Sequence, residues 1–182
     1  MLFNKYLIKA ILLAPIFATP SFVSANNFNY NHLEFGYHTN PNAMGAAARL
    51  AFHENAHIVG LFSTQWEGDW FSGVGVGFNG PINDFVDVTG DLVLNYLREP
   101  GEEDHDTGEL ANTINLGVRA WIQPNVEVNL TVGRFFLDQD DSFSEVKLGA
   151  RLYSNDAFSL GVVWAPVSYF DDSVVFSVRY EF

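Results

Sequence analysis

The chain contains no cysteine and few basic residues, and both absences exclude classes of function. Of its 182 residues, 9 are Lys or Arg and 22 are Asp or Glu, which gives a formal net charge of −13. A disulfide framework, a Cys-ligated metal and thiol chemistry all require cysteine, so none of them applies. A nucleic-acid binder needs a basic face that neutralises phosphates, so the acidic balance predicts no nucleic-acid partner.

Long hydrophobic runs are also absent beyond the N-terminal region. After Asn26 no run of about 18 apolar residues occurs, and the mean hydropathy of +0.05 is too low for a bundle of membrane-spanning helices. Aromatic residues, in contrast, are plentiful, with 17 Phe, 7 Tyr and 4 Trp. Aromatic side chains are enriched in strands, so this composition favours β structure.

Residues 1–25 have the features of a secretory signal peptide. Two lysines precede an apolar stretch, and Val23-Ser24-Ala25 places small side chains before a cleavage point at Asn26. Pro15 and Pro20 interrupt the apolar stretch, which is shorter than the roughly 20 residues that a membrane-spanning helix requires. We therefore expect an exported protein whose mature chain, residues 26–182, forms one domain with a net charge of −15.

The mature chain alternates between apolar and polar residues with a period of two. The last segment illustrates the pattern, because one parity carries only apolar or aromatic side chains, namely Val174, Phe176, Val178, Tyr180 and Phe182. Successive side chains of a strand point to opposite faces, so each such segment has one apolar face and one polar or small face. Either a soluble β-sandwich or a transmembrane β-barrel could produce this alternation.

Segment length favours the barrel over the sandwich. Many segments run for about 9–11 residues, which is the span a tilted strand needs to cross a membrane, whereas soluble strands more often have about 5–6. We predict a closed, antiparallel, up-and-down barrel of about ten strands, with eight as the alternative. The expected strands are 28–38, 45–53, 57–66, 70–79, 85–97, 110–121, 126–137, 143–153, 157–165 and 173–182.

The connections between these segments alternate between short turns and longer acidic loops, as they do in outer-membrane barrels. Residues 123–125 and 154–156 carry the Asn, Asp and Pro of tight turns. The most acidic loop holds six carboxylates: Glu99, Glu102, Glu103, Asp104, Asp106 and Glu109. These carboxylates could recruit divalent cations, which also bridge the phosphates of surface lipopolysaccharide. The simpler interpretation is a solvated loop that its own charge keeps extended.

The C-terminal strand resembles the terminal signature of Gram-negative outer-membrane β-barrels. Phe176, Val178, Tyr180 and Phe182 occupy the apolar positions of that signature. The resemblance implies that the barrel-assembly machinery reads this strand and that the protein lies in the bacterial outer membrane, in contact with lipid and lipopolysaccharide. Residues 73–82 and 147–152 also resemble segments of the YfaZ-like group of small barrels, which implies architecture but no activity.

Aromatic residues gather where strands are expected to end. We predict two belts at the lipid headgroups. The belt on the side of the longer loops contains Trp66, Trp70, Phe71, Tyr96, Phe135, Phe136, Phe143, Trp164, Tyr169 and Phe170. The belt on the side of the short turns contains Phe28, Tyr30, Phe158, Tyr180 and Phe182.

Charged residues recur on the polar parity of the strands, which in a barrel faces the lumen. We call them the lumen charge network: Glu34, Arg49, Asp87, Asp91, Arg119, Glu127, Glu145, Lys147, Arg151 and Arg179. Because an unpaired buried charge is costly, these acids and bases should pair and plug the lumen. A narrow or gated pore is the alternative, since glycines on the same parity would leave room for neighbours or for water.

Three classes of function follow from this sequence. The first is an outer-membrane barrel of structural or surface type, or a small pore, with no cofactor and no chemistry. The second is an enzyme that modifies lipids or peptides, for which His38 and His105 near the loop end are the candidates, although no nucleophile–base pair is evident. The third is a soluble, exported β-sandwich that acts as a binding module.

Overall fold

The computed structural model describes residues 28–66, 69–98, 108–137, 142–167 and 172–182, and these residues form ten strands. The strands are β1 (His32–Thr39), β2 (Asn42–His53), β3 (Ala56–Thr64), β4 (Trp70–Asn83), β5 (Val86–Arg98), β6 (Gly108–Gln123), β7 (Val126–Leu137), β8 (Ser142–Tyr153), β9 (Phe158–Val167) and β10 (Ser173–Glu181). The predicted signal peptide, residues 1–25, lies outside the described residues.

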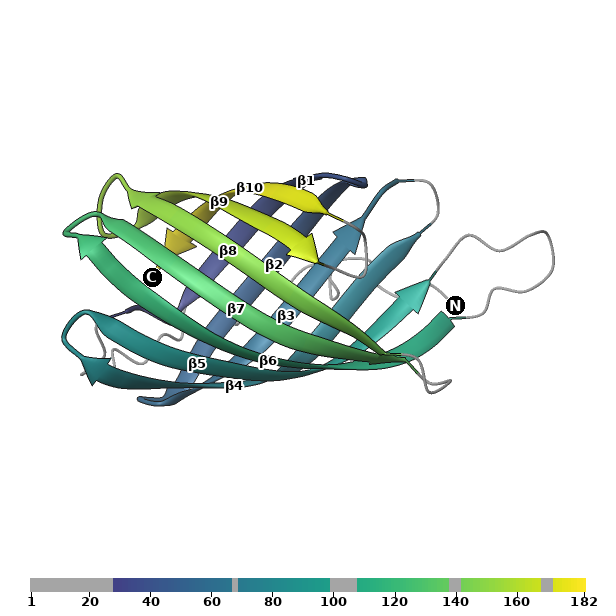
Figure 1. Ribbon diagram of the computed structural model, residues 1–182, viewed down its shortest axis with the longest axis horizontal. Helices are drawn as coiled ribbons and strands as arrows, with labels where there is room; N and C mark the ends of the chain where they lie inside the picture. The colour runs from purple at the N-terminus through teal and green to yellow at the C-terminus, as the bar shows by residue number, and fades with distance from the viewer. Residues whose placement is uncertain (1–27, 67–68, 99–107, 138–141, 168–171) are drawn as a thin grey trace, which may run out of the picture.

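The ten strands form one closed barrel, in which each strand pairs with its neighbours in the sequence and β1 pairs with β10 (Figure 1). The closing register runs from His32 opposite Glu181 to His38 opposite Val175. All pairings are antiparallel, so the predicted fold class and ten strands are confirmed, and the eight-strand alternative is wrong. A β-sandwich is also wrong, because a single closed sheet leaves no second sheet to pack against it.

Strand β2 begins earlier than the sequence predicts. Its stretch from Ala43 onward has weak β propensity, and we expected a strand only from residue 45. Pairing with β1 on one side and with β3 on the other extends the strand to Asn42, because the ladder partners on both sides satisfy its backbone groups. The connection between β1 and β2 is consequently a tight turn at the same end as the longer loops.

The apolar parity of each strand faces outward. Along β6, Leu110, Ile114, Leu116, Val118 and Ile122 are all exposed on the outer surface, while the alternate positions face the interior. The same division holds in β10, where Phe176, Val178 and Tyr180 are exposed, as is Phe182 directly after the strand. An outer surface covered by large apolar side chains is the arrangement that hydrocarbon requires.

The predicted aromatic belts are confirmed only in part. Tyr96, Phe136 and Trp164 lie on the outer surface near the loop end, and Phe158, Tyr180 and Phe182 lie on it near the turn end. Phe28 and Tyr30, however, are buried inside the barrel. Phe71 and Phe135 also belong to the inward parity and pack against each other near the loop end. Tyr169 and Phe170 lie outside the described residues.

Within the described residues, no helix has the length and apolar character needed to cross a membrane.

Candidate functional site

The interior of the barrel has two halves with different chemistry. The half near the short turns lies at the left in Figure 1. Its interior is filled by buried side chains that we call the polar plug. The half near the longer loops holds a cavity. The polar plug consists of Tyr30, His32, Glu34, Arg49, His57, Asp87, Asp91, Arg119, Glu127, Arg151, Tyr153, Arg179 and Glu181.

A bidentate ion pair between β6 and β7 lies at the centre of the polar plug. Arg119 donates from Nε and Nη2 to the two carboxylate oxygens of Glu127, at 2.9 and 2.8 Å. The same guanidinium lies over the ring of Phe28, 4.5 Å from its centroid, and 5.0 Å from that of Tyr30. Only 1% of Glu127 is exposed, so this carboxylate depends on protein partners to remain charged.

Tyr153 extends this group of side chains toward the closing strand. Its hydroxyl lies 2.8 Å from a carboxylate oxygen of Glu127 and 3.0 Å from one of Glu181. The hydroxyl therefore bridges two carboxylates from β7 and β10. A second bridge spans the closure, because Glu34 of β1 accepts hydrogen bonds from Arg151 of β8 and from Arg179 of β10, the latter at 2.8 Å.

A third cluster joins Arg49 of β2, His57 of β3 and Asp91 of β5. Arg49 donates two hydrogen bonds to the carboxylate of Asp91, at 2.8 and 2.7 Å. The His57 ring is fully buried, and its Nε2 contacts both Arg49 and Asp91. Strand β4 lies between β3 and β5, and its Gly77 makes room for the pair because its missing side chain would occupy the space of His57 and Asp91.

Two aromatic residues before β1, Tyr30 of the polar plug and Phe28 beside it, pack against the side chains of the strands. The Phe28 ring stacks on the ring of Trp121, and the Tyr30 ring stacks on that of His57; the ring centroids are 5.1 Å apart in both pairs. The Tyr30 hydroxyl donates to Asp87 at 3.0 Å. Burial raises the pKa of this hydroxyl well above its usual value, so Tyr30 stays protonated and remains a donor.

All ten residues of the predicted lumen charge network belong to the inward parity, but they do not form one network. Glu145 and Lys147 pair with each other at 2.8 Å in the loop half, apart from the polar plug. Five members of the plug were not part of the predicted network: Tyr30, His32, His57, Tyr153 and Glu181. For those that lie within strands, one feature of the sequence could have indicated that they belong to the plug, namely a polar or titratable side chain on the inward parity.

The packing of Gly77 gives a prediction for the third cluster. A Cβ at this position would lie 2.2 Å from Nε2 of His57 and 2.3 Å from Oδ1 of Asp91. We expect Gly77→Ala to displace both side chains and to lower the free energy of unfolding by about 1–3 kcal/mol. The measurement is the urea midpoint of the refolded barrel in lipid vesicles.

Gly60→Ala is the matched control for this prediction. No atom lies within 4 Å of a Cβ built at Gly60, which belongs to the outward parity of β3. We expect this variant to be neutral or to gain about 0.5–1 kcal/mol, because alanine orders more easily in a strand than glycine does. Equal urea midpoints for the two variants would contradict the packing assigned to Gly77.

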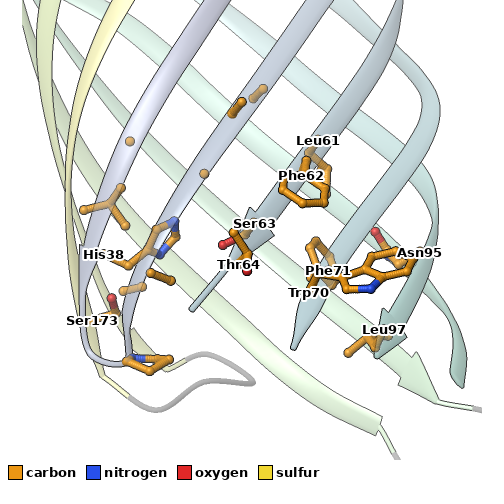
Figure 2. Close-up of a pocket in the computed structure, with 18 of the residues that line it drawn as sticks. His38, Leu61, Phe62, Ser63, Thr64, Trp70, Phe71, Asn95, Leu97 and Ser173 are labelled. Atoms are coloured by element: carbon orange, nitrogen blue, oxygen red, sulfur yellow. The ribbon is translucent and has the colours of Figure 1, made fainter. Parts of the chain in front are cut away.

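The loop half of the barrel contains a cavity of about 850 Å³ (Figure 2). His38 and Ser173 lie on one wall, and Phe71, Asn95 and Leu97 lie on the opposite wall. Glu34 and Ser177 border the cavity on the side of the polar plug, so the plug forms its floor. Gln65, Asp69 and Arg98 lie at its rim near the loops.

Three other sites were predicted from the sequence, namely the assembly signal, the acidic loop and the two candidate histidines, and the structure describes only some of their residues. Phe176, Val178, Tyr180 and Phe182, the predicted assembly signal, all face outward. In the acidic loop, Glu99, Glu102, Glu103, Asp104 and Asp106 lie outside the described residues, and Glu109 is the second residue of β6. Of the two candidate histidines, His38 lines the cavity and His105 is not described. Within the described ranges, no group of three or more His, Asp and Glu residues could hold a metal ion.

Comparison with known proteins identifies a fold but no family. No family model and no curated protein match the chain. The translocator domain of the autotransporter NalP from Neisseria meningitidis is 13% identical, with 84% of this chain and 68% of that domain covered and a TM-score of 0.50. The NanC porin is 8% identical, with 83% and 98% covered and a TM-score of 0.49. The channel DcaP of Acinetobacter baumannii is 16% identical, with 81% and 54% covered and a TM-score of 0.40.

At these identities the likeness shows the fold alone, and the match to the NalP translocator identifies that fold as a transmembrane β-barrel. The resemblance to outer-membrane barrels that the C-terminal strand indicated is thus confirmed at the level of fold. Its finer part, the YfaZ-like group, receives no support from these comparisons.

Proposed function

We propose that the protein is an outer-membrane barrel of structural or surface type whose lumen is closed to ions. The polar plug supports this proposal most directly. Its ion pairs connect β1 with β8 and β10, β2 with β5, and β6 with β7. The pairs between β1 and β8 and between β2 and β5 join strands that are not neighbours, so these side chains reach past the strands between them inside the barrel. The Phe28 and Tyr30 rings fill space beside them.

The energetics of the plug favour a closed lumen over a pore. Conduction requires a continuous path of water through the barrel, and such a path would have to separate side chains that are paired and buried. Arg151 and Glu127 are only 4% and 1% exposed, and breaking a buried ion pair leaves an uncompensated charge. The cavity in the loop half is therefore a blind pocket above the plug rather than part of a channel.

Single-channel recording in planar bilayers tests the proposal. The protein is refolded into detergent, its folding is verified by heat-modifiable migration on gels, and it is added to bilayers in which a general porin serves as the positive control. We expect no conductance steps from the folded protein. Regular steps that require folded protein would overturn the proposal and support the small pore instead.

The proposal includes a location and partners. We infer export through a cleaved signal peptide to the bacterial outer membrane, where the outward apolar parity would contact lipid and lipopolysaccharide. The outward positions of Phe176, Val178, Tyr180 and Phe182 are compatible with recognition of the last strand by the barrel-assembly machinery. Divalent cations at the acidic loop remain part of the proposal. Recovery in the outer-membrane fraction, with release only by detergent, is the expected result of cell fractionation.

A further inference from the structure

The cavity above the polar plug has the size of a site for one small molecule. Its volume of about 850 Å³ lies within the range of roughly 300–1,000 Å³ that is typical of ligand pockets. The cavity has a floor, made by the plug, and a rim near the loops, so a ligand could enter from the loop end but could not pass through. The inference that follows rests on the proposed closure of the turn end.

The cavity walls offer an apolar surface on several sides. Leu61 and Phe71 come from β3 and β4, and Val163 and Val175 come from β9 and β10. Phe71 packs on Phe135, with ring centroids 6.3 Å apart, so this part of the wall is held in place. Replacing water against such apolar surface with an apolar group lowers the free energy of the system and so favours binding. The body of the ligand is therefore expected to be hydrocarbon.

The charged groups of the walls already have partners. Glu34 is paired with Arg151 and Arg179, and Lys147 is paired with Glu145. At the rim, Asp69 and Arg98 carry opposite charges. A charged ligand would lose its hydration without finding a free countercharge in the walls, and this loss is unfavourable. The cavity therefore favours a ligand without net charge.

The cavity wall also contains uncharged side chains that can form hydrogen bonds with a ligand. Ser63, Asn115 and His38 line the cavity between the apolar positions, and each side chain can form hydrogen bonds with a hydroxyl group. We propose that the cavity binds one neutral amphipathic molecule, with a hydrocarbon body and a hydroxyl head group. Neutral single-chain lipids and fatty alcohols belong to this chemical class.

Protection of a single thiol provides the test, because the chain has no cysteine of its own. Ala47 lines the cavity, and Ala47→Cys is a small change that introduces a reporter for a water-soluble maleimide. We expect the thiol to react in the refolded barrel and octanol to slow the reaction about tenfold when present at about ten times its Kd. Octanoate and octylammonium, which have the same chain length but carry a charge, should protect less at equal concentration.

Two controls distinguish binding from other effects. Asn155→Cys introduces a thiol in the exposed turn between β8 and β9, at the end of the barrel opposite the cavity, and its reaction rate should not change with octanol. Glucose, which is neutral but lacks a hydrocarbon body, should leave the Ala47→Cys thiol unprotected. Any of three results would overturn the inference. The first is an Ala47→Cys thiol that does not react in the absence of ligand, and the second is a reaction of this thiol that octanol fails to slow. The third result is protection by a charged probe or by glucose that equals or exceeds the protection by octanol.

The outcome can be separated from that of the conductance experiment. Conductance steps together with selective protection by octanol would contradict the closed lumen and leave the site in place. Absence of steps together with unchanged labelling rates would contradict the site and leave the closed lumen in place.

Discussion

Arg119→Ala is expected to lower the free energy of unfolding by about 3–5 kcal/mol, because it leaves the carboxylate of Glu127 buried and without its main partner. Glu127 accepts two hydrogen bonds from this guanidinium and, within the part of the chain that the structure describes, would keep one from the hydroxyl of Tyr153. The substitution also removes the cation from the faces of Phe28 and Tyr30, so the contacts of the N-terminal aromatic residues weaken as well. The measurement is denaturant unfolding of the refolded barrel in lipid vesicles.

Two further variants show whether the loss arises from the unpaired charge. Arg119→Met combined with Glu127→Leu removes both charges and keeps similar volume, so most of the lost stability should return. Arg134→Ala removes an exposed arginine whose contacts with described residues are hydrogen bonds to Ser142 and a position over the ring of Phe136, and it should change stability by no more than about 0.5 kcal/mol. If Arg119→Ala costs no more than Arg134→Ala, the assignment of Arg119–Glu127 as a buried ion pair is wrong.

The sequence was sufficient to predict the barrel because its pattern repeats in every strand. A period of two places all side chains of one parity on one face. The outward direction of the apolar residues of β6 and β10 could therefore be predicted without knowing which strands pair with them. The same rule assigned Glu34, Asp91 and Arg151 to the lumen. The ends of the strands were less certain, and β2 began three residues earlier than expected because pairing on both sides overrides a weak propensity.

The pairing of charges could not be predicted in the same way. Glu34 and Arg151 are separated by 117 positions in the sequence, and they meet only because the barrel closes between β1 and β10 and the strands tilt. Register and tilt are properties of the whole sheet, so parity indicates which residues face the lumen but not which of them touch. For this reason the predicted network proved to be separate clusters, with Glu145 and Lys147 apart from the plug.

Phe28 and Tyr30 were misplaced for a related physical reason. We expected both residues within a first strand over 28–38 and placed them in a belt, because an aromatic residue near a strand end fits the headgroup region. The first strand begins later, at His32, and the two rings that precede it are buried inside the barrel, on the side of Glu34 to which their parity also assigned them. Arg119, Asp87 and Trp121 offer partners inside the barrel that a bilayer would not. The cavity also had no signal in the sequence, because its volume depends on how far inward side chains from many strands reach.

The division of each strand into a lipid face and a lumen face is the claim on which the whole account depends. Leu116 lies in the middle of β6 and Ile122 lies next to its last residue, and both face outward with similar exposure, 55% and 61%. In water the substitutions Leu116→Arg and Ile122→Arg would therefore have similar consequences. In a bilayer they would differ, because an arginine near the midplane costs about 2–4 kcal/mol and one near the interface costs only about 0–1 kcal/mol.

The free energy of unfolding of these two variants in lipid vesicles is the most direct measurement of that claim. We expect Leu116→Arg to destabilise the barrel by about 2–4 kcal/mol relative to the unsubstituted protein and Ile122→Arg to be close to neutral. Equal costs for the two substitutions would contradict that claim, since the middle of the outer surface would then not lie in hydrocarbon.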